Sequence, residues 1–212
     1  MLRLTGLSLA AALMATSAHA TIIIADGQIG GPLDNVLFNN NPPDGTAVQG
    51  VLNGTLFPVF FIGNGTEILH GNGGQARLEA VDGGLNYVDF GIGPGAGFET
   101  AEFNFNTTRT APGTSVTITA WDQFGASFAG NFALTPNGQN FFNLTTANNE
   151  LITRITLATA NDYIDLRRIR IGGAQTISSG VPEPSTWAMM LIGFAGLGFC
   201  YRARARQLAA QA

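Results

Sequence analysis

Few residues in this sequence have the types and spacing that catalysis requires. Outside the first 20 residues there is one histidine, His70, in a segment rich in Gly and Asn, and no Gly-x-Ser-x-Gly segment offers a serine nucleophile. Glycoside hydrolysis uses two carboxylates that flank one bond. Glu99 and Glu102 are close in sequence but point to opposite faces of a strand, so such a pair would need acids that converge from separate strands. The sequence therefore predicts no catalytic residue.

The ligand clusters of transition-metal sites are also missing from the sequence. The one cysteine, Cys200, lies in an apolar segment near the C-terminus, and no cluster of His or Cys occurs. Zinc and copper are therefore not expected. Without a second cysteine, the domain must be stabilised by its core rather than by a disulfide.

Two aromatic residues are candidates for contacts with carbohydrate, because sugar C–H faces stack on aromatic rings beside polar groups. Trp121 has the parity of the polar residues at 115, 117 and 119 in a predicted strand, which indicates either an outward side chain or a position past the end of the strand. The alternative is a tryptophan in the core or at its rim. Tyr87 allows the same interpretations.

Strands must position these side chains, because apolar and polar residues alternate with period two along much of the chain. Turn segments rich in Gly, Asn and Pro separate the strands, and no stretch of the domain has a period of 3.6 residues. This pattern predicts an all-β fold, an antiparallel β-sandwich of the jelly-roll kind. The clearest alternating segments are Ala76–Ala80, Asn86–Ile92, Ala101–Phe105 and Val116–Ala120.

Three further segments carry specific predictions. Thr21–Ala25 is β-branched and apolar, which predicts the first strand. Leu56–Ile62 is apolar on both faces, which predicts a strand buried on two sides, and its Pro58 indicates an edge position or an irregular start. Tyr163–Ile171 is the predicted last strand. Its apolar parity switches at Arg167-Arg168, which predicts a β-bulge there.

The charge balance limits the class of partner. There is no lysine, and residues 21–180 contain thirteen acidic residues against six arginines. Nucleic acids and anionic lipids favour basic surfaces, so neither is expected as a partner. Neutral sugars and cations are compatible with this charge.

Both ends of the chain have the features of targeting segments. Residues 1–20 combine an early arginine, an apolar stretch and the ending Ala18-His19-Ala20, which predicts a signal peptide cleaved by signal peptidase after export by the secretion machinery. Residues 21–172 form the predicted sandwich domain, and residues 173–181 form a linker. Near the C-terminus, Pro182, Glu183 and Pro184 predict an extended hinge.

The hinge is followed by an apolar run that starts at Trp187 and has no charge until Arg202. Arg204 and Arg206 extend the basic end. An apolar segment with a basic end predicts a membrane helix, about residues 185–201, with its arginines in the cytoplasm. The run only just reaches the length that spans a bilayer, which is typical of a temporary anchor.

In this order, the three segments of residues 182–206 resemble the PEP-CTERM sorting signal. The resemblance implies that an exosortase, a membrane transpeptidase, processes the chain near Pro182-Glu183-Pro184. It also implies that the protein is exported across the inner membrane, held briefly by its C-terminal helix, and then placed at the cell surface or in an extracellular matrix with exopolysaccharide. An unprocessed membrane anchor is the alternative.

The second half of the domain resembles jelly-roll modules that bind carbohydrate. The residues that carry this resemblance are Ser115–Trp121, Leu151–Ala158 and Tyr163–Gly172. Such modules often hold a structural calcium between their first and last strands, which implies Asp26, Asp34 and Asp165 as candidate ligands. For Asp26 and Asp34 the alternative is a role in turns, and for Asp165 it is an ion pair with a nearby arginine.

Together these observations predict an exported, non-catalytic surface or matrix protein that associates with exopolysaccharide and has carbohydrate contacts at Trp121 and Tyr87. A secreted hydrolase acting on glycans and a purely structural adhesion protein are the alternatives. Converging acids would favour the hydrolase, whereas long exposed edge strands would favour adhesion.

Overall fold

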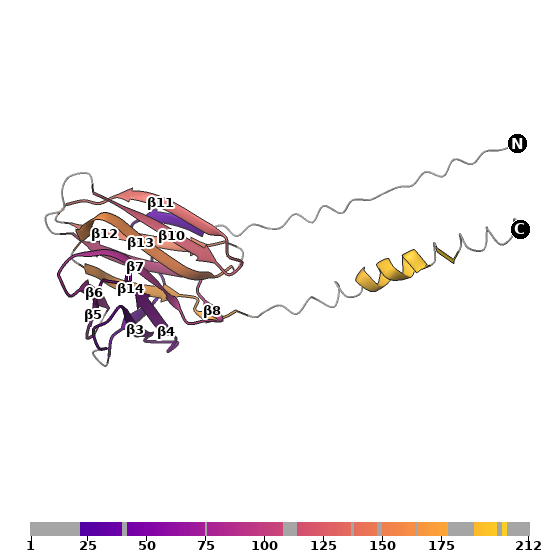
Figure 1. Ribbon diagram of the computed structural model, residues 1–212, viewed down its shortest axis with the longest axis horizontal. Coiled ribbons are helices and arrows are strands. Elements are labelled where there is room, and N and C mark those ends of the chain that lie inside the picture. The colour runs from indigo at the N-terminus through magenta and orange to yellow at the C-terminus, as the bar shows by residue number, and fades with distance from the viewer. Residues whose placement is uncertain are drawn as a thin grey trace, which may run out of the picture. The chain divides into compact units, whose positions relative to one another are not determined.

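The computed structural model describes residues 22–39, 42–74, 76–107, 114–136, 138–147, 150–163, 165–177, 189–198 and 201–202. The chain divides into two compact units, and the first ends at Ile177. All strands of the described residues belong to this first unit, as do the core residues that they bury. The first unit therefore contains a core of its own, and its strands are drawn as arrows in Figure 1.

The first unit is an antiparallel β-sandwich of two sheets. Sheet A consists of β1 (Ile22–Asp26), β12 (Gln139–Thr146), β9 (Thr100–Asn106), β14 (Asp165–Gly172), β6 (Arg77–Ala80) and β5 (Leu69–Asn72). Sheet B consists of β3 (Ala47–Leu52), β4 (Pro58–Ile62), β7 (Leu85–Ile92), β13 (Ile152–Tyr163), β10 (Ser115–Asp122) and β11 (Ser127–Ala133).

The short strand β2 (Asp34–Leu37) connects the two sheets. Its first half pairs with the second half of β14 in sheet A, and its second half pairs with β3 in sheet B. β6 pairs with the first half of β14, so β14 has neighbours along most of both edges. β14 is thereby an interior strand of sheet A.

A series of buried aromatic rings runs through the core from sheet B to sheet A. Successive ring centroids lie between 5.5 and 6.3 Å apart, and the rings of Phe90 and Phe103 meet edge to face where the two sheets pack together. Offset and edge-to-face contacts at this spacing stabilise beyond their buried area. The rings belong to Phe38, Phe61, Phe90, Phe103 and Phe142.

The alternation predicted from the sequence is confirmed in the central strands. In β10, Val116, Ile118 and Ala120 are buried, while the residues between them are exposed or half-buried. The predicted bulge is also confirmed. The pairing of β14 with β9 changes register between Arg167 and Arg170, and Arg168 has a positive φ of 50°.

The prediction that Leu56–Ile62 is buried on both faces is wrong. β4 begins at Pro58, so the proline marks an irregular start, and the strand lies between β3 and β7 rather than at an edge. Val59 and Phe61 are buried, but Phe60 is 36% and Ile62 49% exposed. The physical reason is that the sandwich covers only the inner face of sheet B.

The prediction of one last strand over Tyr163–Ile171 also needs correction. Tyr163 ends β13 in sheet B, and Asp165 begins β14 in sheet A. The chain therefore changes sheets here, and residue 164 lies outside the described residues. Two strands with different inner faces follow each other, which period-two alternation alone does not separate.

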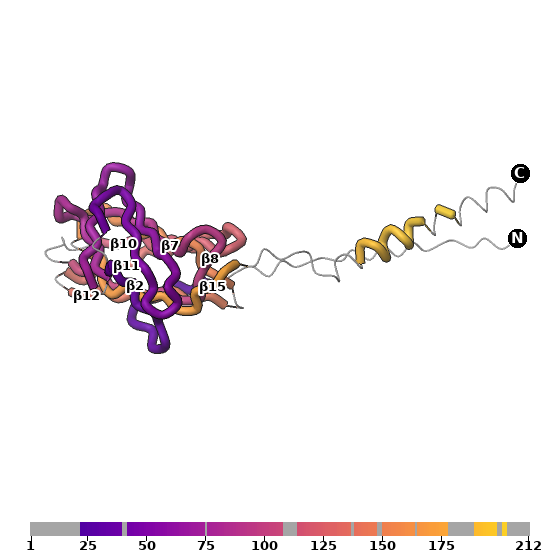
Figure 2. Tube along the Cα trace, turned by 90° about the horizontal axis from the view of Figure 1, so that it is seen from below, coloured from indigo at the N-terminus to yellow at the C-terminus, as the bar shows by residue number. Residues whose placement is uncertain are grey.

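The end of the first unit extends beyond the predicted domain boundary at residue 172. The two-residue strand β15 (Gln175–Thr176) pairs with β8 (Ala96–Gly97), and the Ile177 N–H donates to the Gly95 carbonyl oxygen at 2.8 Å. Figure 2 shows β15 beside β8 at one end of the sandwich. The first five residues of the predicted linker therefore belong to the folded unit.

Candidate functional site

Trp121 lies on the outer face of sheet B, near the end of β10. The indole is half-buried, and the guanidinium carbon of Arg154 lies 3.7 Å from its ring centroid. Arg154 is the register partner of Trp121 on β13, so strand pairing brings the two side chains together. A cation this close to an indole face is attracted by the ring quadrupole, which holds both side chains in place.

Asp89 on β7 lies next to Arg154 and adds a carboxylate to the Trp121–Arg154 pair. Its carboxylate lies 3.4 Å from Arg154 Nε and accepts a hydrogen bond of 3.1 Å from the Thr156 hydroxyl. Burial raises the pKa of Asp89 above its usual value, although Arg154 and Thr156 both oppose this change. The outer face thus carries an ordered row of hydrogen-bonding groups on three adjacent strands.

A groove of about 420 Å³ adjoins these polar groups. Gly91 forms its floor, and no side chain fits there because a Cβ atom would lie 2.3 Å from the Thr153 carbonyl oxygen. Phe60 and Ile62 of β4 form one wall, and Arg154 belongs to the opposite wall. We call this hollow the Gly91 groove.

The Gly91 groove is part of a row that crosses four strands of sheet B. Phe60 pairs with Gly91, whose neighbour on β13 is Arg154, and Arg154 pairs with Trp121. Three strand spacings of about 4.8 Å make this row about 14 Å long. An aromatic side chain stands at each end, with the glycine floor and the guanidinium between them.

Tyr87 lies on the same outer face but not in this row. It is half-buried on β7, four residues before Gly91, and pairs with Ala158. Both predicted aromatic candidates therefore face outward from one sheet, with Trp121 in the row and Tyr87 further along the strands.

The three predicted calcium ligands do not form one cluster. Among the described residues, no group of three or more His, Cys, Asp or Glu side chains is placed to hold a metal ion. Asp34 begins strand β2 rather than lying in a turn, and its Oδ2 accepts a hydrogen bond from the distant Thr55 N–H at 3.0 Å. Asp26 is exposed at the end of β1. Calcium binding stays a prediction for these residues.

Asp165 is fully buried between arginines on sheet A. Arg167 Nε lies 2.5 Å from its Oδ1, and Arg77 Nε lies 2.9 Å from its Oδ2. The ion pair with Arg167 is the alternative that the sequence offered for this residue. The Asp165 Oδ2 accepts hydrogen bonds from Arg77 Nε and from Arg167, which offsets part of the cost of burying the carboxylate.

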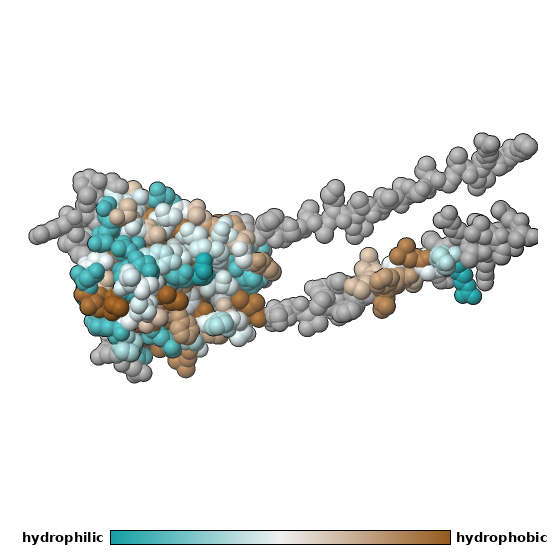
Figure 3. Space-filling model, in the orientation of Figure 1, coloured by the Kyte–Doolittle hydropathy of each residue, from teal (hydrophilic) through white to brown (hydrophobic). Residues whose placement is uncertain are grey.

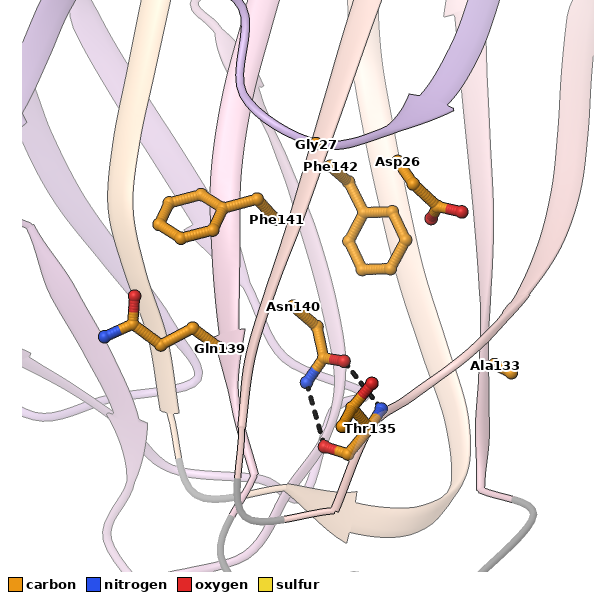
Figure 4. Close-up of a pocket in the computed structure, with 8 residues that line it drawn as sticks. All are labelled: Asp26, Gly27, Ala133, Thr135, Gln139, Asn140, Phe141 and Phe142. Carbon is orange, nitrogen blue, oxygen red and sulfur yellow. Dashed lines mark hydrogen bonds between the residues drawn. The ribbon is translucent and has the colours of Figure 1, made fainter.

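Asp26 lines a second pocket of about 330 Å³ at the start of β12. In Figure 4, Asn140 makes two hydrogen bonds with the backbone of Thr135, at 2.6 Å and 3.3 Å. Asp26 is the one carboxylate among the eight residues that line this pocket, whereas glycoside hydrolysis uses two. The lining therefore does not supply the paired acids that the hydrolase alternative needs.

The sorting residues lie mostly outside the described part of the chain. This holds for Pro182, Glu183, Pro184, Trp187, Arg204 and Arg206. Residues 189–198 are helical and exposed, Arg202 belongs to a short described piece, and Figure 3 colours the helix mainly as hydrophobic. None of the described helices has both the length and the apolar character that crossing a bilayer requires. The membrane anchor stays a prediction.

Comparisons with known proteins identify a sorting motif near the C-terminal end of this β-sandwich protein. The PEP-CTERM protein-sorting motif matches residues 180–206. The chain therefore carries a PEP-CTERM motif, as its Pro-Glu-Pro, apolar and arginine segments indicated. A protein with this motif is exported and sorted to the cell surface through its C-terminus, with an exosortase as its processing partner.

A search among curated proteins gave no match. Among solved structures, a mutant of a family 29 carbohydrate-binding module, described in a study of its ligand recognition, is similar to this chain at 12% identity. The alignment covers 78% of this chain and 99% of the module, with a TM-score of 0.25.

Several residues of the outer face were not found from the sequence. Arg154 lies on β13, whose pairing with β10 and with the strand of Asp89, β7, could not be assigned from the sequence. Phe60 and Ile62 were placed in the core. Gly91 offered a usable signal, because a glycine inside an alternating strand indicates a close approach or an open surface.

Proposed function

We propose that the folded unit is a non-catalytic carbohydrate-binding domain of a surface or matrix protein, and that it contacts exopolysaccharide through the outer face of sheet B. The row from Phe60 to Trp121 carries this proposal. It combines two partly exposed aromatic side chains with an open groove and an ion pair, which is the composition of sites that bind small polar ligands. Figure 3 shows hydrophobic patches among hydrophilic residues on one face of the molecule.

Each part of the row has a role in the proposed contact. Phe60 and Trp121 offer apolar surface to the C–H faces of sugar rings. The guanidinium of Arg154 donates hydrogen bonds to sugar hydroxyls, and the carboxylate of Asp89, its ion-pair partner, accepts hydrogen bonds from them. Because their mutual ion pair already orders these side chains, little conformational entropy is lost on binding.

The proposal is tested with the domain spanning residues 21–180 on an array of neutral glycans. Trp121→Ala is expected to weaken binding at least tenfold, because losing an aromatic anchor of a binding site costs about 2 kcal/mol. Phe141→Ala is the matched control, since Phe141 is a half-buried aromatic on the outer face of sheet A. Equal binding by the wild type and Trp121→Ala, or no binding to any neutral glycan, would contradict the proposal.

The same samples distinguish binding from hydrolysis. Retained glycans should be recovered intact, without new reducing ends. Release of shortened products by the wild-type domain would instead support the hydrolase alternative.

A further inference from the structure

Arginines gather on the face of the sandwich opposite the proposed carbohydrate face. Residues 21–180 contain six arginines. Four of these six extend from the outer face of sheet A, one from β6 and three from β14, although acidic residues outnumber arginines in the domain. They are Arg77, Arg167, Arg168 and Arg170.

The β-bulge in β14 produces this concentration. Period-two alternation would turn one of two successive residues inward, but the extra residue of a bulge lets both Arg167 and Arg168 face outward. Arg168 takes a left-handed conformation with φ of 50°, and its N–H donates to the Ala76 carbonyl oxygen at 3.1 Å. A non-glycine residue with positive φ is strained, and such strain gathers at functional sites.

Arg168 differs from its three neighbours in its pairing. Arg77 and Arg167 both pair with Asp165, and Arg170 lies 3.2 Å from Glu102. Among the described residues, no carboxylate pairs with Arg168. Its guanidinium carbon instead lies 5.5 Å from the ring centroid of Phe141 on β12. Contact with the ring face fixes this charge in place without neutralising it.

Asn104 is a second, independent sign of a ligand at this position. It lies on β9, opposite Arg167 on one side and Phe141 on the other, so its strand separates the strand of Arg168 from Phe141. Asn104 is 1% exposed, and its side-chain oxygen has no hydrogen-bond donor. Buried acceptors are nearly always satisfied, so this oxygen calls for a donor such as a ligand hydroxyl. A pocket of about 230 Å³ lined by Ala76, Arg77, Arg167 and Arg168 adjoins the group.

We infer that Arg168 and Asn104 form a site for one acidic sugar unit, with the guanidinium of Arg168 binding its carboxylate and the oxygen of Asn104 accepting from its hydroxyl. Arginine binds carboxylates strongly because its planar donors match the two oxygens. The excess of acidic residues over the whole domain opposes dense polyanions, so the ligand is a sparsely charged saccharide. This site goes beyond the proposed function, because it lies on the other sheet and takes a different class of sugar.

The experiment compares two trisaccharides that differ in one group. One ends in glucuronate, and the other ends in glucose, in which the carboxylate is replaced by an alcohol. Calorimetric titration of the 21–180 domain should give at least tenfold tighter binding of the glucuronate form. Arg168→Gly should remove this difference, and the glucuronate form should shift the Asn104 side-chain amide resonances in the wild type.

Arg168→Gly is chosen because glycine adopts a φ of 50° without strain, so the variant should fold at least as well as the wild type. Trp121→Ala is the control on the opposite face and should keep the preference for glucuronate. The inference is overturned if both trisaccharides bind equally, or if Arg168→Gly keeps the preference. Loss of neutral-glycan binding in Trp121→Ala with this preference intact would separate the two sites.

Discussion

Single charged residues in this domain mostly have defined partners. Asp165, Glu102 and Asp89 are each held by an arginine, and the Asp122 carboxylate accepts from the backbone of the following turn at 2.8 Å. Such pairing explains how a domain with few charges tolerates several of them in buried positions. Arg168 stands out against this background, because its only described contact of this kind is with an aromatic ring.

His70 provides a direct test of one such pair. Its Nδ1 lies 2.6 Å from Asp44 Oδ1, and this hydrogen bond raises the pKa of His70 above 6.5, the ordinary value for histidine. Since no other histidine occurs in residues 21–180, NMR titration of its ring protons reports this group alone. The midpoint should lie above 6.5 in the folded domain.

Asp44→Asn is the control and should return the midpoint of His70 towards 6.5. Because the folded pKa is raised, the stabilisation is fully present below the unfolded pKa and is lost as the pH rises through the folded pKa. Its size should be small, since both side chains are exposed to solvent. An identical midpoint in both proteins would contradict the assigned pair.

For single residues, the sequence said more about the direction of a side chain than about the residues that it contacts. The parity of Trp121 offered an outward side chain as one of several interpretations, because the face of a strand residue follows from period two alone. Its stacking with Arg154 depends on the pairing of two strands that are distant in sequence. Register of that kind is set by the whole sheet and is not encoded locally.

At the scale of elements, strands and the β14 bulge could be predicted because apolar parity is a local property. The crossing from β13 to β14 could not, since one residue separates two strands of different sheets. The exposure of Phe60 and Ile62 was also hidden, because apolar residues on both faces of β4 gave no sign of which face the core covers. This error concerned the residues that form one wall of the Gly91 groove.

Gly91→Ala tests how closely the two central strands of sheet B approach. Its Cβ would lie 2.3 Å from the Thr153 carbonyl oxygen, so the backbones of β7 and β13 must move apart. We expect a loss of about 1–3 kcal/mol, as for other overpacked sites. At about 2–4 °C per kcal/mol for a domain of this size, the melting temperature should fall by roughly 2–12 °C.

Gly30→Ala is the matched control for this measurement. A Cβ at Gly30 would meet nothing within 4 Å, and its φ is not in the left-handed region. Its melting temperature should therefore stay close to that of the wild type. Equal melting temperatures for Gly91→Ala and the wild type would contradict the close approach of β7 and β13 at this position.

At the scale of the whole molecule, the folded domain depends on its aromatic core, because it has no disulfide. Phe103 contacts the rings of Phe90, Phe105 and Phe142, which makes it a central member of the series. Phe103→Ala should lower the free energy of unfolding by about 3–5 kcal/mol, the usual cost of removing a buried phenylalanine ring. Urea denaturation measures this change.

Phe124→Ala serves as the comparison for Phe103→Ala. Phe124 is 71% exposed in the turn after β10, so its removal should change the unfolding free energy by less than about 0.5 kcal/mol. Similar losses in the two variants would mean that the aromatic core does not carry the stability of the domain.

The sorting tail gives a second prediction at this scale. Changing Pro182-Glu183-Pro184 to alanines should leave an uncleaved, membrane-bound form in cells that contain an exosortase, because the motif at residues 180–206 is then incomplete. Immunoblots of membrane and released fractions measure this. Ser178→Ala together with Ser179→Ala, which leaves the motif unchanged, should be processed normally. Normal processing of the alanine variant would refute the role of the Pro-Glu-Pro segment.

The sequence was most informative about the export and sorting of the protein and least informative about the ligand of its folded domain. A sorting motif is a short linear pattern, so its residues identify it without the fold. A binding face on a sandwich is assembled from several strands, and its chemistry appears only when those strands are placed in order.

The small ladder of β15 and β8 has a mechanical consequence. In a chain tethered through its C-terminal end, force enters the folded unit at Ile177. The hydrogen bond to Gly95 and the β15–β8 pairs are loaded one after another, so they unzip before β14, which is bonded along both edges. Residues 173–177 would then be released as a segment that spans at most about 16 Å, at roughly 3.3 Å each. Loss of this ladder would leave the strands of both outer faces paired, because β15 and β8 belong to neither sheet A nor sheet B.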